Sequence, residues 1–225
     1  MTDNRLLTCA KLVKGKKAVD VGTDHGYLSV YLISEGICDK VVACDVNEKP
    51  LNAARKTVQK SGYGEKVEVV LSDGLDDVKS DGVTDVIMAG MGGELIVKLL
   101  DKCSWLKVKG NSVNLVLQPM SKSHILRKWL FDNNFSVEKE LACEDGGFVY
   151  SVMQASFTGI KPDYLCDNRY LYGGRVNADD ECGAAYLQRQ AQRLKTAGLG
   201  MLKSADKKDE GEMLIKSSEI LLRGI

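Results

Sequence analysis

Short apolar runs alternate with helical patterns along the first 131 residues, and this alternation constrains the fold more than any other feature of the sequence. The apolar runs cover residues 18–21, 41–46, 67–71, 83–89 and 114–118. A short amphipathic helix is expected at 4–14, and apolar residues at helical spacing also mark 27–33, 51–60, 95–100 and 124–131. Strands that alternate with helices form parallel sheets covered on both faces. The sequence therefore predicts a doubly wound, Rossmann-like α/β domain.

The pattern changes after about residue 135. Residues 136–142 and 148–155 are rich in strand-forming residues, and the turn between them contains Gly146 and Gly147. Two strands joined by so short a turn run antiparallel. We therefore expect the sheet to end in an antiparallel hairpin, which plain dinucleotide-binding folds do not require.

The C-terminal third of the chain is helical in pattern. Residues 157–180 show no clear period, whereas 184–202 and 207–223 each place apolar residues on one helical face. Two such helices in succession predict a helical hairpin of coiled-coil type. We therefore expect a nucleotide-binding domain at residues 1–156 and a helical domain at 157–225.

The charge of the chain is balanced overall but is unevenly distributed. Lys and Arg together number 31, as do Asp and Glu, so the formal net charge is zero. Residues 1–17 hold five basic side chains and one acidic side chain, a net +4, and residues 184–225 hold eight and five, a net +3. The span between them must therefore carry −7. Two basic ends permit a nucleic-acid partner.

The cysteines and histidines predict neither disulfides nor a metal site. Seven cysteines occur, an odd number, and no two stand at C-x-x-C spacing, while the two histidines lie far apart. No apolar run approaches the roughly 20 residues of a membrane span. We therefore expect a protein of the reducing cytoplasm, with no membrane and no metal.

A glycine turn follows the first predicted strand, where an α/β fold binds its nucleotide. In the dinucleotide fingerprint a glycine stands two residues after the first glycine, but here Asp24 holds that position after Gly22. A carboxylate about 4 Å from a diphosphate is repelled by about 1–4 kcal/mol. A nucleoside with positive charge fits better, because Asp20 and Asp24 stabilise a sulfonium and an α-ammonium. S-adenosylmethionine has this charge pattern; the alternative is an ordinary tight turn.

Two further acids end the next strands. Asp45 lies about 20 residues beyond the glycine turn, where a carboxylate accepts hydrogen bonds from ribose hydroxyls. Asp73 follows the third strand, within reach of an adenine amino group. Strand-end aspartates also serve as helix caps or turn formers, which is the alternative for each. The predicted cofactor contacts are Asp20, Gly22, Thr23, Asp24, His25, Gly26, Asp45, Val46, Asp73, Gly74 and Leu75.

Several motifs together give the chain a family resemblance over residues 5–155. They are Asp-Val-Gly-Thr-Asp-His-Gly-Tyr-Leu at 20–28, Cys-Asp-Val-Asn at 44–47, Ser-Asp-Gly-Leu at 72–75, Met-Ala-Gly-Met-Gly-Gly at 88–93 and Leu-Gln-Pro at 117–119. With these the sequence resembles the bacterial tRNA (adenine 22-N1)-methyltransferases, which are class I S-adenosylmethionine-dependent enzymes. It departs from that family at Ser29, where proline is usual, at Gly26, where alanine is common, and at residues 171–176.

The resemblance implies an enzyme that transfers a methyl group from S-adenosylmethionine to N1 of adenine 22 in tRNA. It also implies a methyltransferase sheet and a C-terminal helical coiled-coil element. Two alternatives stay open. One is a methyltransferase that acts on another RNA, a small molecule or a protein, and the other is a non-catalytic RNA-binding module.

The fourth predicted strand ends in glycines rather than in the Asp/Asn-Pro-Pro-aromatic turn usual for methylation of exocyclic amines. Adenine N1 has an in-plane lone pair and needs no deprotonation, so catalysis would depend on positioning. The glycines also suit simple helix packing, Gln118 is either a donor to a base edge or a buried amide, and His25 is better suited to fixing its loop than to acting as a base. The predicted catalytic residues are Gly90, Met91, Gly92 and Gln118.

Basic residues near the chain start and after the fifth predicted strand are candidate phosphate contacts. A solvated surface is the alternative for any one of them. Because N1 takes part in base pairing, the target adenine must be unstacked or flipped to react. The predicted RNA contacts are Arg5, Lys11, Lys14, Lys122, Arg127 and Lys128.

Overall fold

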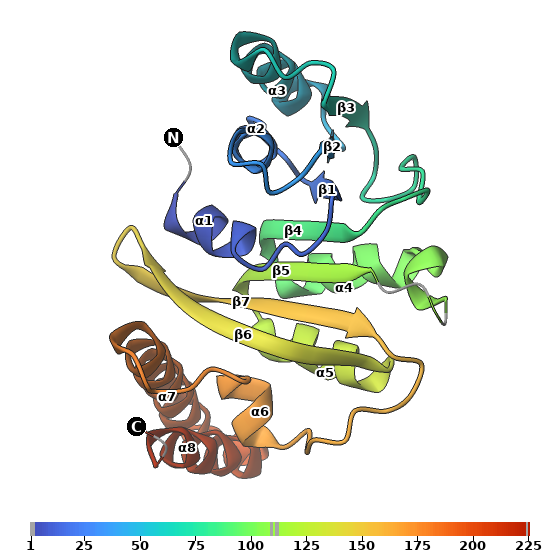
Figure 1. Ribbon diagram of the computed structural model, residues 1–225. Coiled ribbons are helices and arrows are strands. Elements are labelled where there is room, and N and C mark those ends of the chain that lie inside the picture. The colour runs from blue at the N-terminus through green and yellow to red at the C-terminus, as the bar shows by residue number, and fades with distance from the viewer. Residues whose placement is uncertain (1–2, 109, 111–112, 224) are drawn as a thin grey trace.

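The computed structural model describes residues 3–108, 110, 113–223 and 225, and its seven described strands form one sheet (Figure 1). The strand order is β3-β2-β1-β4-β5-β7-β6. The strands are β1 (Lys17–Val21), β2 (Lys40–Asp45), β3 (Val67–Leu71), β4 (Asp85–Gly92), β5 (Asn114–Ser121), β6 (Phe135–Asp145) and β7 (Phe148–Phe157). β1 to β5 are mutually parallel, and β7 joins β5 and β6 in antiparallel pairing. The predicted fold and its terminal hairpin are thus confirmed.

Helices cover both faces of the sheet. The helices are α1 (Asn4–Ala10), α2 (Tyr27–Ser34), α3 (Glu48–Ser61), α4 (Gly93–Lys102), α5 (Ser123–Asp132), α6 (Asn168–Gly173), α7 (Glu181–Met201) and α8 (Lys208–Leu222), with 3-10 turns η1 (Ser104–Lys107) and η2 (Ala205–Lys207). Within β1, Val19 packs into the core under α4 and α5, whereas Ala18 packs into the core under α1, α2 and α3. Apolar side chains on both faces are what a two-sided parallel sheet requires.

The chain reverses its direction of winding between β1 and β4, which lie side by side at the centre of the sheet. Ligands of open α/β sheets bind at such a switch point, beyond the carboxyl ends of the strands. The turns that follow β1, β2, β3, β4 and β5 all meet at this edge, and they carry the motifs that the sequence singled out.

The first helix is shorter than predicted, because it ends at Ala10 instead of residue 14. The cause lies across the sheet at Asp85, which is fully buried at the start of β4. The Asp85 carboxylate accepts hydrogen bonds from the backbone N–H groups of Lys14 and Gly15, at 2.9 and 2.8 Å. A helix continued to residue 14 would keep those N–H groups for its own backbone, so the chain leaves the helix early.

The C-terminal helices lie along the β6 side of the sheet and cross each other closely (Figure 1). A Cβ atom added to Gly198 on α7 would lie 2.6 Å from the carbonyl oxygen of Gly211 on α8. An apolar cluster that includes Val149, Leu187 and Leu214 joins this pair to β7. The helical hairpin is confirmed, and the division into domains at residues 156 and 157 stays a prediction.

A buried ion pair connects the C-terminal helices to the sheet. Arg127 on α5 and Glu140 on β6 have no exposed side-chain surface, and their charged atoms lie 2.6 Å apart. The Arg127 guanidinium also donates to the hydroxyl of Tyr186 on α7 at 2.7 Å and to the carbonyl of Leu171 at 2.7 Å. The predicted phosphate contact at Arg127 is therefore wrong, because every route from this guanidinium to solvent is closed.

Candidate active site

The turn after β1 is held tightly against the neighbouring strands. The N–H groups of Gly22 and Thr23 donate to the carbonyl of Cys44 on β2, at 2.8 and 3.0 Å. Gly22 has a φ of 70°, and a Cβ atom there would lie 2.3 Å from Cε of Met91. Only glycine suits both the backbone angle and the space. The turn thus presents bare backbone at the carboxyl edge of the sheet.

Asp20 fixes this turn from below. Its carboxylate accepts hydrogen bonds from the hydroxyls of Thr23 and Ser29, each at 2.7 Å. Burial raises the pKa of Asp20, while the bonds from Ser29 and Thr23 oppose that rise. Ser29, which departs from the proline usual in the family, is thus a hydrogen-bond donor to the turn. Asp20 lines the cavity described next, but much of its bonding capacity is already used within the protein.

A cavity of 570 Å³ opens above the turn. Asp24 and His25 line it from the turn, Arg5 from α1, Gly90 from β4 and Met120 from β5. The Asp24 side chain is 70% exposed, so its carboxylate is free to meet a ligand. The prediction that Asp24 meets a positively charged group of the ligand stays a prediction, and Arg5 shares this cavity with it.

A second cavity, of 290 Å³, continues the first along the sheet edge. Gly22, Ala89 and Gly90 line both cavities. Asp45 and Val46 line the second cavity, and Asp45 already accepts a hydrogen bond from the N–H of Asn47 at 2.9 Å on one carboxylate oxygen. The other oxygen of Asp45 remains for a ligand hydroxyl.

Asp73 and Gly74 line the second cavity from the turn after β3. The Asp73 carboxylate pairs with the ammonium of Lys102 at 2.8 Å, and this hydrogen bond and charge lower the pKa of Asp73. Asp73 is thus already paired with a cation, whereas no described cation pairs with Asp45. We infer that it contributes less to ligand binding than the sequence suggested.

Two predicted cofactor contacts line neither cavity. Leu75 is buried in the core beneath α4, where it packs with other apolar side chains. Gly26 caps the N-terminus of α2 with a φ of 72°, and a Cβ atom there would lie 3.2 Å from Ala54 on α3. Both residues support the turns from behind, so we correct their role from contact to support.

The end of β4 brings the predicted acceptor residues to the rim between the two cavities. Gly90 has a φ of 79°, and its N–H donates to Oε1 of Gln118 at 3.0 Å. Met91 lines the second cavity and covers Gly22. Gly92 caps α4 and lines neither cavity, so of the three only Gly90 and Met91 lie where a substrate would contact them.

Gln118 is a buried amide and not a donor to a base edge. It has no exposed surface, and its Oε1 accepts from Arg5 Nη1 at 3.1 Å as well as from Gly90. Its Nε2 donates to the carbonyl of Pro119 at 3.3 Å. The predicted catalytic role is therefore wrong, and Gln118 instead ties Arg5 to the backbone of Gly90.

Arg5 reaches the site because α1 packs beside β4 and β5, and no local sequence motif indicates this position. It also pairs with Asp3 at 2.5 Å and lies 3.7 Å from Asp145 at the β6–β7 turn. Sequence reasoning assigned Arg5 to RNA but could not place it on the cofactor cavity, because the sheet brings α1 beside β5 only after folding. Met120 was missed for the same reason.

His25 lies on the open rim. Its ring stacks on Tyr27 with centroids 5.4 Å apart, and Nε2 lies 3.7 Å from the Asp24 carboxylate. These contacts support the interpretation of His25 as a loop or ligand-contacting residue. Among the described residues, no group of three or more His, Cys, Asp or Glu side chains could hold a metal ion.

The remaining basic residues that were predicted to contact RNA are exposed. Most are paired: Lys14 with Glu138 at 2.7 Å, Lys122 with Glu94 at 2.6 Å and Lys128 with Asp132 at 2.7 Å. Lys11 lies on the exposed side of the chain after α1. Their predicted contact with RNA stays a prediction, and an RNA phosphate would have to compete with the paired carboxylates. The described part of the chain contains no helix suited to crossing a membrane.

A doubly wound sheet with a glycine turn after β1, an acid at the end of β2 and a glycine rim after β4 defines a methyltransferase domain. The family model for the Methyltransferase domain matches residues 2–153, which include both cavities. The chain belongs to this family.

Two proteins similar to this chain are named as tRNA methyltransferases. The tRNA (adenine(22)-N(1))-methyltransferase of Bacillus subtilis is 31% identical over 152 residues, which is 67% of this chain and 63% of that protein. A Mycoplasma pneumoniae protein, provisionally named a tRNA methyltransferase, is 31% identical over 185 residues, 79% of this chain and 82% of its own. The chain therefore spans less than two thirds of the Bacillus protein and most of the Mycoplasma protein.

A solved structure extends the likeness over the whole chain. Streptococcus pneumoniae Sp1610 in complex with S-adenosyl-L-methionine is 27% identical, with a TM-score of 0.81 over 97% of this chain and 98% of that one. The likeness therefore includes the C-terminal helical hairpin as well as the sheet.

Proposed function

We propose that this protein transfers the methyl group of S-adenosylmethionine to N1 of adenine 22 in tRNA. The observation that carries the proposal is the pair of cavities joined at Gly22 and Gly90 in a chain whose Bacillus relative bears the name of that activity. The complex of the Streptococcus relative with S-adenosyl-L-methionine supports the choice of cofactor. A tRNA substrate supports the proposal that the enzyme acts in the cytoplasm.

The residues of the two cavities fit the cofactor. The bare backbone at Gly22, where a Cβ atom would lie 2.3 Å from Met91 Cε, leaves room for close approach. Asp45 would accept from the ribose hydroxyls, and Asp24 would face the positively charged methionine end. When bound, S-adenosylmethionine supplies a methyl group on a cationic sulfur.

The chain's own contribution to the reaction is positioning. Adenine N1 presents a lone pair and needs no general base, so the site has only to align that nitrogen with the methyl group and exclude water. Gly90 carries no side chain at the rim, and the nearest atom to a Cβ built there would be Arg5 Nη1 at 3.7 Å. The hydrogen bond that the Gly90 N–H donates to Gln118 Oε1 holds this rim in place.

The proposal is tested by incubating the protein with labelled S-adenosylmethionine and tRNA transcripts that carry adenine or guanine at position 22. Nuclease digestion and mass spectrometry should find 1-methyladenosine only in the adenine transcript. Methyl incorporation that is indifferent to the replacement would overturn the acceptor. Transfer without RNA would favour a small-molecule or protein substrate, and RNA retention without transfer would favour a binding module.

A further inference from the structure

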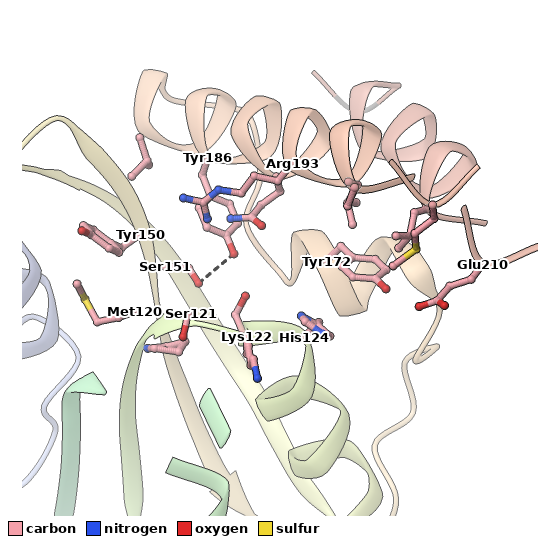
Figure 2. A pocket seen from close by; sticks show the side chains of 18 residues that line it. Met120, Ser121, Lys122, His124, Tyr150, Ser151, Tyr172, Tyr186, Arg193 and Glu210 are labelled. Carbon is pink, nitrogen blue, oxygen red and sulfur yellow. Dashed lines mark hydrogen bonds between the residues drawn. The ribbon is translucent and has the colours of Figure 1, made fainter. Parts of the chain in front are cut away.

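A third cavity, of 380 Å³, lies where the C-terminal helices meet the sheet. Ser121 at the end of β5, Lys122 after it and His124 in α5 form one wall, and Figure 2 shows Arg193 on α7 facing them from the other. Met120 lines this cavity and also the cofactor cavity. The space is thus the immediate neighbour of the site where the methyl acceptor would lie, at the same edge of the sheet.

The side chains of this cavity include one available cation, the carboxylate of Glu210 and aromatic rings. Arg193 is exposed, and no described residue forms an ion pair or hydrogen bond with its guanidinium. The rings of His124 and Tyr172 lie 5.3 Å apart, and both side chains are half-buried. Burial lowers the pKa of His124, the charges of Arg127 and Lys122 lower it further, and the charge of Glu94 opposes this shift.

We propose that this cavity takes a second nucleotide of the tRNA substrate, one that flanks the target adenine and is unstacked with it. Arg193 would bind its phosphate, and His124 and Tyr172 would contact its base. The inference rests on the proposed function and adds a subsite to it. Single-stranded RNA bases are commonly stacked on aromatic side chains, and a phosphate suits a free guanidinium.

The size and position of the cavity favour a nucleotide over a larger partner. Its 380 Å³ falls near the lower end of the roughly 300–1,000 Å³ that small-ligand sites occupy, which suits a single nucleotide. Because Met120 lines both this cavity and the cofactor cavity, a nucleotide next to the flipped adenine would lie beside this space. Because α7 and α8 form the outer wall, the subsite also gives the helical hairpin a direct role in substrate binding.

The first test removes the cation. Arg193→Gln is compared with Lys195→Gln, which makes the same charge change at an exposed residue of α7 that does not line the cavity. With tRNA titrated into the protein saturated with S-adenosylhomocysteine, Arg193→Gln should weaken binding about tenfold. The slope of log affinity against log salt should also fall by about one, as expected for the loss of a single phosphate contact.

The second test fills the space without changing charge. Ala197→Trp places a large ring in the cavity wall, whereas Thr196→Trp places it on the neighbouring exposed residue of α7, which does not line the cavity. Ala197→Trp should weaken tRNA binding and leave the affinity for S-adenosylmethionine unchanged, and Thr196→Trp should alter neither. Circular dichroism and thermal melting confirm that each variant is folded.

The outcomes separate this inference from the proposed function. If the wild type methylates tRNA but Arg193→Gln and Ala197→Trp bind tRNA as tightly as their controls, the subsite is wrong and the proposed function stands. If the wild type methylates no tRNA, the proposed function fails, and the subsite fails with it. Weaker binding by both cavity variants, with unaltered controls, supports the subsite.

Discussion

Charged side chains have opposite roles at the cofactor edge of the sheet and at the joint between the sheet and the C-terminal helices. At the cofactor edge, Asp24 and Asp45 lie at the surface of open cavities with bonding capacity to spare. At the joint with the C-terminal helices, Arg127 and Glu140 are completely buried and are bonded to each other and to Tyr186. At the cofactor edge the carboxylates remain available for a ligand, whereas at the joint the two charges neutralise each other within the protein.

This difference separates binding from stability. A buried ion pair loses its hydration and is tolerated only when both charges have each other and further hydrogen-bond partners. Removal of one member therefore lowers the stability of the fold strongly. An exposed carboxylate keeps its hydration until a ligand displaces it, so its removal affects the ligand and leaves the fold nearly intact. Variants at the two regions should therefore affect different measurements.

The largest effect is expected at the joint. Arg127→Met leaves the Glu140 carboxylate buried without a cation and should lower the free energy of unfolding by about 3–5 kcal/mol, measured by urea denaturation. Lys128→Met is the matched control, because Lys128 is the next residue of α5 and forms an exposed pair with Asp132. Equal stability of the two variants would contradict the contrast between the regions.

The second effect concerns the cofactor edge alone. Asp45→Asn removes an unpaired carboxylate oxygen and should weaken binding of S-adenosylmethionine about tenfold or more in calorimetric titration, with an unchanged midpoint of unfolding. Asp73→Asn should have the smaller effect, because Lys102 already pairs with that carboxylate. A greater loss of affinity for Asp73→Asn than for Asp45→Asn would reverse our ranking of the two acids.

The smallest effect is expected at His124, which lines the third cavity and lies against Tyr172. Because burial lowers the pKa of this imidazole below its ordinary 6.5, the folded state binds the proton less readily than the unfolded state. Stability is therefore full above pH 6.5 and is lost as the pH falls through the lowered pKa of the folded protein. His124→Gln should flatten this loss in urea titrations from about pH 8 to about pH 5. If the free energy of unfolding of His124→Gln fell with decreasing pH as steeply as that of the wild type, His124 would not be the cause of the pH dependence.

Much of the fold could be predicted because its signals are local. Apolar runs, helical spacing and the Gly146-Gly147 turn each lie within a few residues, so the strands and the hairpin were identified from them. The glycine turn after β1 and Asp45 were found in the same way. Helix α6 (Asn168–Gly173) was missed, because six residues are too few to show a helical period.

The errors concern residues whose surroundings come from distant parts of the chain. Arg127 has the charged side chain typical of a surface residue, and only folding brings Glu140 and Tyr186 into contact with it. For Gln118 the strand-end position left a donor to a base edge and a buried amide both open, and the bonds that decide between them run to Arg5 and Gly90, 113 and 28 residues away in sequence. Burial of a polar group is a tertiary property, and local patterns do not contain it.

The glycine crossing of α7 and α8 has a consequence for how this hairpin can change over evolution. The Gly198 and Gly211 backbones pass so close that a Cβ atom on either would lie within 3 Å of the other's carbonyl oxygen. A deletion of one residue in the connecting turn would rotate a side-chain-bearing residue into that gap and force the helices apart. The hairpin can therefore lengthen beyond the crossing, but its two arms cannot slip past each other by a single position.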